Sequence, residues 1–451
     1  MFVERIESPG LAHLSYLVGD GGEAAAIDPR RDCGVYLDRA RERGCRITHI
    51  FETHRNEDLV SGAPVLSALT GAPVHHGPHA DGEVAYAGTV REGVTFRIGG
   101  ATLAVLETPG HTDDSLSFAL SEDGGPVLAV FTGDTLFFGD VGRTDFYPER
   151  AAEVAGLLYD SLQKLVDLGD QAVIHPAHGA GSICGGSIAK RETSTIGIER
   201  RTNPRLRIQD RDAFIGAKLA EHHYQPPYFR RMEWLNLQGG SPPPQPLAPP
   251  ALTAEAFEAA CATVVDVRGI AAFLGAHLPG SLCLPADMVP AFVGWLLAAD
   301  EELALVADDA DQAERAARHL ARIGYDRVHG FLAPAITGWA ESGRPFRTLP
   351  AVDAVETARR LAERTNDWTL LDVRGKPEVE DVPMPGAVHI YVGELPARLA
   401  ELEPDRPTTV MCASGARATV AASILRRAGF REVDVFLGSM GAWQAAGYPT
   451  A

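Results

Sequence analysis

Short apolar runs that end in polar residues recur through the first half of the chain. They are SYLVGD, AAAIDP, ITHIFETH, TLAVLETPGH and PVLAVFTGD, and each has the length of a strand that stops at a turn. The stretches near 33–44 and 150–167 predict helices between some of these strands. The pattern therefore predicts mixed α and β layers, with polar chemistry placed where the strands end.

The C-terminal part, of about 200 residues, contains an internal repeat. Four landmarks of a first copy return in a second: VVDVRG at 264–269 as LLDVRG at 370–375, LPGS at 278–281 as MPGA at 384–387, RIGYDRVHGF at 322–331 as RAGFREVDVF at 427–436, and Trp339 as Trp443. Landmarks in one order at a nearly constant offset indicate a tandem duplication. Each copy alternates strands with helices, which is typical of a small parallel α/β sheet.

A proline-rich segment separates the two parts. GGSPPPQPLAPP carries six prolines, which exclude helix and central strand and favour a semi-stiff, extended connector. The expected organisation is an N-terminal domain, a linker, and two copies of a smaller domain, at 1–238, 239–252, 253–347 and 352–451.

Composition excludes several classes of protein. The 451 residues include 41 Lys+Arg and 60 Asp+Glu, a net charge of −19 that disfavours nucleic-acid partners. No run approaches the roughly 18 apolar residues of a membrane span, and MFVERIESPG carries no signal-peptide pattern. Six cysteines without disulfide-framework spacing indicate a reduced, cytoplasmic protein. We expect no membrane partner and leave the formation of a homo-oligomer open.

Four of the predicted strand ends carry metal-ligand chemistry. They are Thr53-His54, Pro109-Gly110-His111, Thr132-Gly133-Asp134 and His175-Pro176-Ala177-His178. A single loop histidine is more often a solvated or hydrogen-bonded residue than a ligand. Four such sites in order, each after an apolar strand, favour one metal centre, because ligands at neighbouring strand tips converge in space.

Residues 1–210 resemble the metallo-β-lactamase superfamily. The motifs that carry the resemblance are SYLVGD…AAAIDP, THRNEDLVSG, ETPGHTDDSLSF, FTGDTLFFGDVGRTDF and HPAHG. Hydrolases of that superfamily have His-x-His-x-Asp-His in the first motif, but here Asn56 and Leu59 replace its second and third histidines. The second metal site then keeps Asp58, His178 and a bridging Asp134, so we expect Asp58 and His178 to be outer-shell residues.

The first metal site keeps His54, His111 and Asp134. Two histidines and one carboxylate with open positions are the ligand signature of non-haem Fe(II) enzymes that activate O₂. We therefore expect one mononuclear Fe(II) site, with Zn(II) in a mononuclear hydrolase, or a decayed site, as alternatives.

Within the superfamily, GDVGRTDF at 139–146 and ERRTNPRL at 199–206 resemble the persulfide dioxygenases. That resemblance implies iron held by His54, His111 and Asp134. Arg143 is a candidate for binding an anionic thiol substrate, because a guanidinium suits bidentate contact with carboxylates. A buried structural ion pair is the alternative for Arg143.

The second repeat copy contains VMCASGARAT at 410–419, where a strand ends at Cys412 and a tight loop leads to Arg417 and a helix. Backbone N–H groups of such a loop form an anion cradle and favour a thiolate nucleophile. The segment resembles the rhodanese (sulfurtransferase) domain over about 353–449. That resemblance implies that Cys412 carries a persulfide while Ser414, Gly415 and Arg417 bind thiosulfate or sulfite.

The first copy differs at this place. Its LVADDADQAERAARHL segment puts Ala307 opposite Cys412, and Asp308, Asp309 and Asp311 would repel an anion. We expect an inactive domain that serves as a spacer, a dimer surface or a docking partner.

Together these features predict an αββα metallo-β-lactamase sandwich followed by two small parallel-sheet rhodanese domains. The leading function is a persulfide dioxygenase that oxidises a low-molecular-weight persulfide, such as glutathione persulfide, with O₂ to sulfite and thiol. Exchange of sulfur among persulfide, sulfite and thiosulfate at Cys412 would accompany it. The alternatives are a zinc-dependent hydroxyacylglutathione-type thioester hydrolase and a non-catalytic sulfur-trafficking protein in which only the last domain is active.

Overall fold

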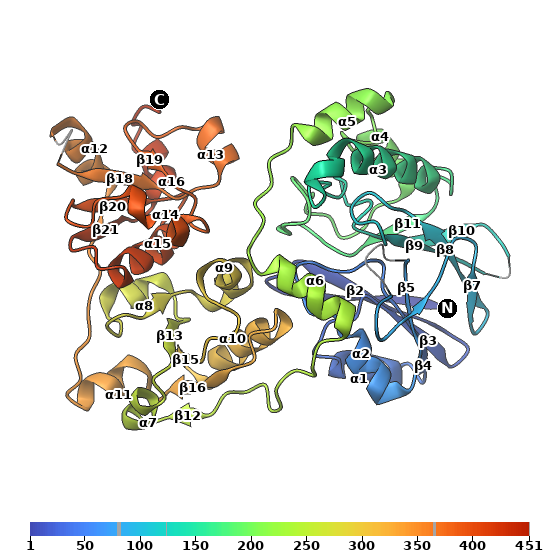
Figure 1. Ribbon diagram of the computed structural model, residues 1–451, viewed down its shortest axis with the longest axis horizontal. Helices are drawn as coiled ribbons and strands as arrows, with labels where there is room; N and C mark the ends of the chain where they lie inside the picture. Colours follow the sequence, from blue (N-terminus) through green and yellow to red (C-terminus); the bar gives the residue numbers. More distant parts are fainter. Residues whose placement is uncertain (79–82, 123, 364–366, 451) are drawn as a thin grey trace. The chain divides into compact units, whose positions relative to one another are not determined.

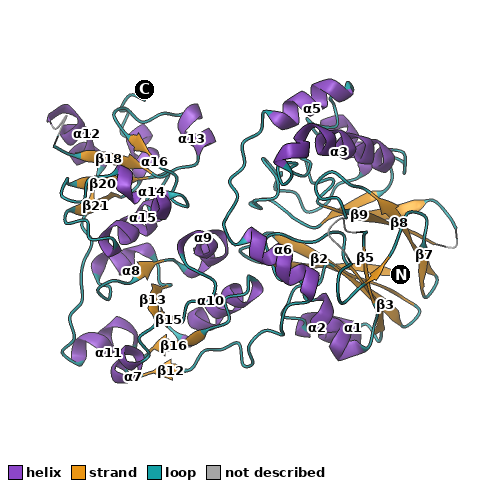
Figure 2. Cartoon of the chain, viewed as in Figure 1, coloured by secondary structure: helices purple, strands orange, loops and turns teal. Residues whose placement is uncertain are grey.

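The computed structural model describes residues 1–78, 83–122, 124–363 and 367–450. It divides into two compact units, Met1–Pro243 with Arg322–Gly324, and Pro244–Ala321 with Tyr325–Ala451. The first boundary between the units lies inside the predicted linker 239–252. Figures 1 and 2 show that both units combine sheets with helices.

The N-terminal unit contains two sheets. The first follows the chain in the order β1 (Phe2–Ser8), β2 (His13–Asp20), β3 (Glu23–Ile27), β4 (Arg46–Phe51), β5 (Val74–His76), β6 (Gly88–Thr89). The second has the order β11 (Val173–Pro176), β10 (Val127–Gly133), β9 (Leu116–Glu122), β8 (Ala101–Glu107), β7 (Thr95–Ile98). Its helices are α1 (Gly34–Glu42), α2 (Ala63–Thr70), α3 (Ala151–Val166), α4 (Ile196–Thr202), α5 (Arg211–Leu219) and α6 (Phe229–Gln238).

Three apolar cores show how these elements are layered. The core between the two sheets includes Phe51 from the first sheet and Phe118 and Phe131 from the second, all fully buried. A second core packs α1 and α2 on the outer face of the first sheet, and a third packs α3 and α5 on the outer face of the second. The result is the predicted αββα sandwich, and the helices expected near 33–44 and 150–167 are α1 and α3.

Helix α3 illustrates why the outer layers form. Val154, Leu158, Leu162 and Leu165 recur every three or four residues along it and are all buried. This spacing gives the helix one apolar stripe, which covers the sheet. Burying each such side chain contributes about 1.5–3 kcal/mol to folding.

The C-terminal unit contains two five-stranded parallel sheets with the same strand order. The first is β12 (Ala251–Leu252), β16 (Val328–Leu332), β15 (Leu303–Val306), β13 (Thr263–Asp266), β14 (Leu282–Cys283), and the second is β17 (Ala351–Val352), β21 (Val433–Phe436), β20 (Thr408–Met411), β18 (Thr369–Asp372), β19 (Val388–His389). The helices of the first copy are α7 (Ala254–Ala259), α8 (Ile270–Gly275), α9 (Val289–Leu296), α10 (Ala310–Arg322) and α11 (Ala335–Glu341). Those of the second are α12 (Ala354–Glu363), α13 (Lys376–Asp381), α14 (Leu395–Arg398), α15 (Ala416–Arg427) and α16 (Ser439–Ala445).

The repeated DVR motif has the same structural role in both copies. Arg268 reaches back to Asp266, and Arg374 to Asp372, with a shortest N–O distance of 2.6 Å in each pair. All four side chains are buried at the end of a central strand. A buried charge needs a hydrogen-bonded partner, so the motif is retained as a structural pair in each copy.

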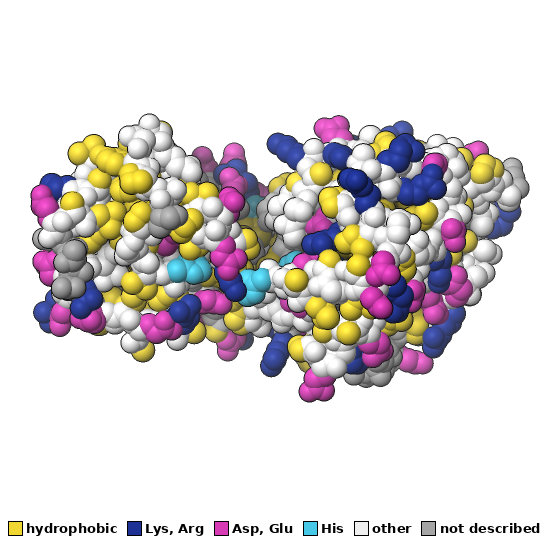
Figure 3. All heavy atoms as spheres, turned by 90° about the horizontal axis from the view of Figure 1, so that it is seen from above, with side chains coloured by type: hydrophobic (Ala, Val, Ile, Leu, Met, Phe, Trp, Pro, Cys, Tyr) yellow, Lys and Arg dark blue, Asp and Glu magenta, His cyan; other side chains and the backbone are white. Residues whose placement is uncertain are grey.

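The surface carries both signs of charge. Acidic and basic side chains intermix on the face of each unit seen in Figure 3. Among the described residues, no helix combines the length and the apolar composition that crossing a bilayer requires.

Candidate metal centre and cysteine site

Three predicted ligands meet where strands of both sheets end. His54 follows β4, His111 follows β8, and Asp134 comes directly after β10. Nε2 of His54 lies 3.7 Å from Oδ2 of Asp134, and Nε2 of His111 lies 3.4 Å from the same atom. All three side chains are buried. These separations suit donors that share one ion, since metal bonds of about 2.0–2.2 Å place neighbouring donors roughly 3–4 Å apart.

Backbone hydrogen bonds hold the strand ends together. The Leu116 N–H donates to the Thr53 carbonyl at 2.6 Å, which joins the end of β4 in one sheet to β9 in the other. The Ala177 N–H donates to the Gly133 carbonyl at 3.0 Å, which fixes the end of β11 beside the end of β10. The polar residues that follow the strands of the two sheets therefore lie close together.

Each histidine of the triad is anchored through Nδ1. The hydroxyl of Thr53 donates to Oδ2 of Asp28 at 2.8 Å, so its oxygen accepts the N–H of His54 Nδ1 at 2.9 Å. Nδ1 of His111 donates to the carbonyl of Arg143 at 2.9 Å. Both Nε2 atoms are buried without a hydrogen-bond partner. A hydrogen bond at Nδ1 typically orients a metal-ligating imidazole in this way, with Nε2 directed at the ion.

The charge state of the triad also suits a divalent cation. Burial lowers the pKa of His54, and it lowers the pKa of His111 to about 3, so both rings are neutral at pH 7 and keep a free lone pair. Burial works to raise the pKa of Asp134, but His178 and His54 outweigh it and hold that pKa below its usual range. Two neutral imidazoles and one carboxylate are thus ready to bind a metal.

Asp58 and His178 lie beside the triad, with His178 in contact with Asp134 and Asp58 in contact with His178. Nδ1 of His178 is 2.8 Å from Oδ1 of Asp134, and Nε2 of His178 is 3.0 Å from Oδ2 of Asp58. Both side chains are buried. His178 therefore connects Asp58 to the carboxylate that completes the triad.

Two buried groups beside these residues were not predicted. Cys184 lies against Asp58 and His178 with one donor atom of each within 4.8 Å of the others. Oε2 of Glu57 is 3.8 Å from Nε2 of His111, its two oxygens have no hydrogen-bond partner, and burial raises its pKa well above the usual value. Glu57 stands inside the first motif and could have been singled out there, whereas no pattern in the sequence marks Cys184.

The prediction that Arg143 binds a substrate does not match its position. Its side chain is fully buried, and its guanidinium makes a bidentate pair with Asp145 at 2.6 and 2.7 Å. Nη1 donates to the carbonyls of Ile183 and Tyr224. With these donors occupied, Arg143 acts as a structural ion pair that fixes the loop behind His111, which is the alternative considered for it.

In the C-terminal unit, Cys412 lies where β20 ends and a loop turns into α15. Its side chain is buried, and the Gly415 N–H donates to Sγ at 3.1 Å. Gly415 has a φ of +108°, a conformation that glycine adopts readily. The Cys412 N–H donates to the hydroxyl of Ser439 at 3.0 Å. An amide directed at sulfur beside a helix N-terminus gives the loop the geometry of an anion-binding site.

The other predicted residues of this site differ in their exposure. Ser414 is exposed on the loop, whereas Gly415 is buried. Arg417 forms a bidentate pair with Glu378 of α13 at 2.5 and 2.7 Å. Burial works to raise the pKa of Glu378, but Arg417 outweighs it and lowers that pKa. Glu378 and Ser439 were missed because their contacts to the loop come from other elements.

The first copy has no such site. Ala307 follows β15 at the position that corresponds to Cys412 and is buried. The turn after it is closed by side chains, since Gln312 accepts from the Asp308 N–H and Asp309 accepts from the Gln312 N–H. Carboxylate and amide oxygens thus occupy the place where the second copy presents N–H groups.

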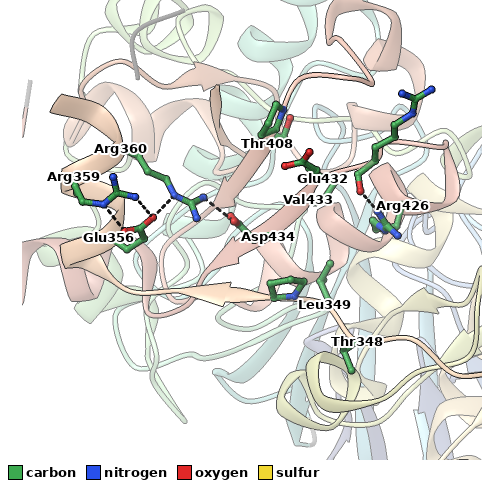
Figure 4. Close-up of a pocket in the computed structure, with 13 residues that line it drawn as sticks. Thr348, Leu349, Glu356, Arg359, Arg360, Thr408, Arg426, Glu432, Val433 and Asp434 are labelled. Carbon is green, nitrogen blue, oxygen red and sulfur yellow. Dashed lines mark hydrogen bonds and ion pairs between the residues drawn. The ribbon is translucent and has the colours of Figure 1, made fainter. Parts of the chain in front are cut away.

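Two cavities are lined neither by the triad nor by Cys412. One of about 440 Å³ borders Thr408 at the opposite end of β20 from Cys412, and there Arg360 is paired with Glu356 and Asp434 (Figure 4). The other, of about 650 Å³, reaches His13 in the N-terminal unit. The lining of the first cavity contains four arginines and three carboxylates.

Comparison with known proteins identifies domains in both parts of the chain. A model of the metallo-beta-lactamase superfamily matches residues 8–178, and a model of the rhodanese-like domain matches residues 355–446. A solved metallo-beta-lactamase from Staphylococcus aureus subsp. aureus COL is 30% identical with a TM-score of 0.67, covering 74% of this chain and 98% of that chain. ETHE1 from Myxococcus xanthus is 30% identical with a TM-score of 0.47, covering 53% of this chain and 100% of that chain.

Curated relatives match part of the chain. A hydroxyacylglutathione hydrolase from Methylobacterium sp. (strain 4-46) is 35% identical over 158 residues, which cover 35% of this chain and 58% of that protein. The chain spans a little over half the length of the first curated relatives it matches.

Proposed function

Because the chain carries a metallo-β-lactamase-fold domain and a C-terminal rhodanese-like domain, we propose that it oxidises a thiol persulfide with O₂ and exchanges sulfur at Cys412. The first reaction consumes a persulfide, O₂ and water, and it yields the free thiol, sulfite and two protons. A small thiol such as glutathione would carry the persulfide.

One observation carries the proposal. His54, His111 and Asp134 form a buried set of two imidazoles and one carboxylate, while Asn56 and Leu59 stand where a binuclear hydrolase has histidines. This ligand set leaves positions open for a substrate sulfur and for dioxygen on Fe(II). Bound Fe(II) would supply electrons to O₂ and a template for the two reactants.

The chain's own residues would position the reaction and shield it. The anchors at Nδ1 keep His54 and His111 aimed at the metal position, which limits reorganisation. Phe146 packs edge-on against the ring of His111 at 5.2 Å and contacts Phe229, so an apolar wall stands beside the ligands. Such a wall excludes water and strengthens the electrostatic interactions of the site.

Sulfur exchange would occur at Cys412. Its thiolate would attack the outer sulfur of thiosulfate, the sulfur–sulfur bond would break, and sulfite would leave with the electron pair. The loop N–H groups would stabilise the anionic sulfur species. The reverse step, from the Cys412 persulfide to sulfite, uses the same atoms.

A second candidate is a metal-dependent thioester hydrolase. It is favoured by the name of the curated relatives, which are hydroxyacylglutathione hydrolases at 35% identity over part of their length. Against it stands the first motif, because Leu59 offers no ligand atom.

Paired assays on one protein preparation distinguish the two candidates. The metal-free full chain is loaded with Fe(II) without oxygen or with Zn(II), and each sample is given glutathione persulfide or a hydroxyacylglutathione thioester. We expect O₂ uptake and sulfite from the iron sample with the persulfide alone. Thioester cleavage by the zinc sample, with no uptake by the iron sample, would favour the hydrolase.

A further inference from the structure

The side chain of Glu57 lies beside the metal triad without belonging to it. Its Oε2 is 3.8 Å from Nε2 of His111, which is about the 3.7 Å spacing between Nε2 of His54 and Oδ2 of Asp134. The donor atoms that lie within 4.8 Å of one another are those of His54, His111 and Asp134, and Glu57 is not among them. Glu57 is therefore next to one ligand atom but outside the ligand set.

The carboxyl group of Glu57 is buried and lacks a partner. The residue is 1% exposed, and neither oxygen has a hydrogen bond within the described part of the chain. The guanidinium of Arg55, two residues earlier, lies 4.0 Å from the carboxylate of Glu233 instead. Burying a polar group without a hydrogen bond costs free energy, so this carboxyl group calls for a hydrogen-bond donor from outside the chain.

The loop that carries Glu57 is held in place on both sides of it. Asn236 of α6 donates to the carbonyls of Asn56 and Leu59 at 2.7 and 2.8 Å. It also accepts the N–H of Ser61 at 2.8 Å, and its own side chain is buried. The position of the Glu57 carboxyl group next to His111 is thus fixed by the fold.

We propose that Glu57 determines which ligands the open positions of the metal centre accept, by accepting a hydrogen bond from the ligating atom. The inference rests on the part of the proposed function that places a divalent ion at the triad, and it does not depend on the oxidation of a persulfide. Ligands whose ligating atom carries a proton, such as water or a protonated persulfide sulfur, would be favoured. Anions without a proton, such as azide, would be disfavoured because they lie beside a second negative charge.

The charges of the centre favour a carboxylate at this place. A divalent ion brings two positive charges, imidazole ligands are neutral, and Asp134 and Glu57 together supply two negative charges. Buried charges need compensation nearby, so the two carboxylates balance the ion. Because Glu57 lies outside the ligand set, it supplies its charge without taking a position that a substrate needs.

The competing explanation is a protonated carboxyl group that only fills space beside His111. It predicts that Glu57→Gln, which keeps the shape of the side chain, leaves the ligand preference of the metal centre unchanged. The proposal predicts a change, because the amide has no negative charge.

Azide binding to the Co(II)-loaded full chain tests the inference without turnover. Metal-free protein is loaded with Co(II) in the absence of oxygen, and azide is titrated while the visible absorption of the Co(II) is recorded. The signal of the triad is the part of the spectrum that His111→Ala loses. Glu57→Gln and Glu57→Ala should both bind azide at least about tenfold more tightly than the unmodified chain, because each removes the negative charge beside the open positions.

Glu233→Gln is the matched control. Glu233 lies on the same side of Arg55's loop but is 35% exposed, so its variant should change the azide affinity less than about twofold. Equal azide affinities in the unmodified chain and both Glu57 variants, with Co(II) still at the triad, would overturn the inference and leave the proposed function standing. Absence of Co(II) from the triad would overturn both. The predicted azide result in a chain that consumes no O₂ with a persulfide would support the inference and contradict the proposed reaction alone.

Discussion

At the scale of single residues, the metal triad depends on atoms that never touch the metal. Asp28 holds Thr53 through both its hydroxyl and its backbone N–H, and Thr53 holds Nδ1 of His54. Asp28 has a φ of +51°, which an aspartate rarely adopts. The backbone at Asp28 is therefore strained in the conformation that directs its carboxylate at Thr53. This chain of contacts selects the tautomer that leaves Nε2 of His54 free.

Removing the Thr53 hydroxyl, which links Asp28 to His54, should weaken metal binding. Thr53→Val keeps the shape of the side chain but loses both hydroxyl contacts, so His54 can rotate or change tautomer. We expect the affinity for Fe(II) or Zn(II) to fall about 10–100-fold, measured by competition with a chelator. Thr48→Val on β4, whose hydroxyl bonds only the Ala24 carbonyl and the neighbouring His49, is the control and should bind metal normally. Equal affinities for the two variants would argue against the anchoring role.

The pair of Arg143 and Asp145 should make stability depend on acid pH. Burial works to raise the pKa of Asp145, but Arg143 outweighs it and lowers that pKa to about 2. A depressed acid pKa adds stability above the unfolded-state pKa, and this stability is lost as the pH falls toward 2. Asp145→Asn should therefore lower the melting temperature at pH 7 and have a smaller effect near pH 3. A difference that stays constant with pH would contradict the ion-pair assignment.

At the scale of elements, the sequence predicted strands and helices well and contacts across elements poorly. Apolar runs located β4, β8 and β10, and the polar residues after them identified His54, His111 and Asp134. Periodicity does not show which strands share a sheet. It therefore could not predict that Cys184 lies beside His178 or that Glu378 lies beside Arg417. The chemistry of Arg143 was visible in the sequence, but its orientation depends on Asp145 and on two distant carbonyls.

The turn after β10 leaves no space for a side chain. A Cβ on Gly142 would lie 2.1 Å from the Asp134 carbonyl oxygen and 3.1 Å from Cβ of His111. Gly142→Ala should displace both ligands, lower stability by about 1–3 kcal/mol and reduce the bound metal. Thermal melting and metal analysis measure these effects.

Gly216→Ala on α5 is the control, because a Cβ there meets nothing within 4 Å. It should raise stability by about 0.5–1 kcal/mol. If Gly142→Ala retains its metal and its melting temperature, the ligand loops are less tightly packed than the account requires.

At the scale of the whole molecule, the metal triad and the cysteine site lie in separate compact units. The triad belongs to Met1–Pro243, and Cys412 belongs to the unit that begins at Pro244. The two copies in the second unit share a strand order, but the first has Ala307 at the position where the second has Cys412. If the proposed function holds, placing both reactions on one chain would raise the local concentration of the sulfite or persulfide that they share.

The two activities should therefore be separable. Cys412→Ser should abolish sulfur transfer from thiosulfate and leave persulfide-dependent O₂ uptake within about twofold of the unmodified chain. His111→Ala should do the opposite, because it removes a metal ligand far from Cys412 in sequence and in another unit. Loss of both activities in Cys412→Ser would mean that the two sites act as one.

Oxygen uptake by the Fe(II)-loaded full chain on addition of glutathione persulfide, with sulfite measured in the same vessel, tests the proposed reaction directly. The amounts of O₂ consumed and sulfite formed should be equal, and Zn(II)-loaded protein and His111→Ala should give neither. Iron-loaded protein that binds metal at the triad but consumes no O₂ with the persulfide would contradict it.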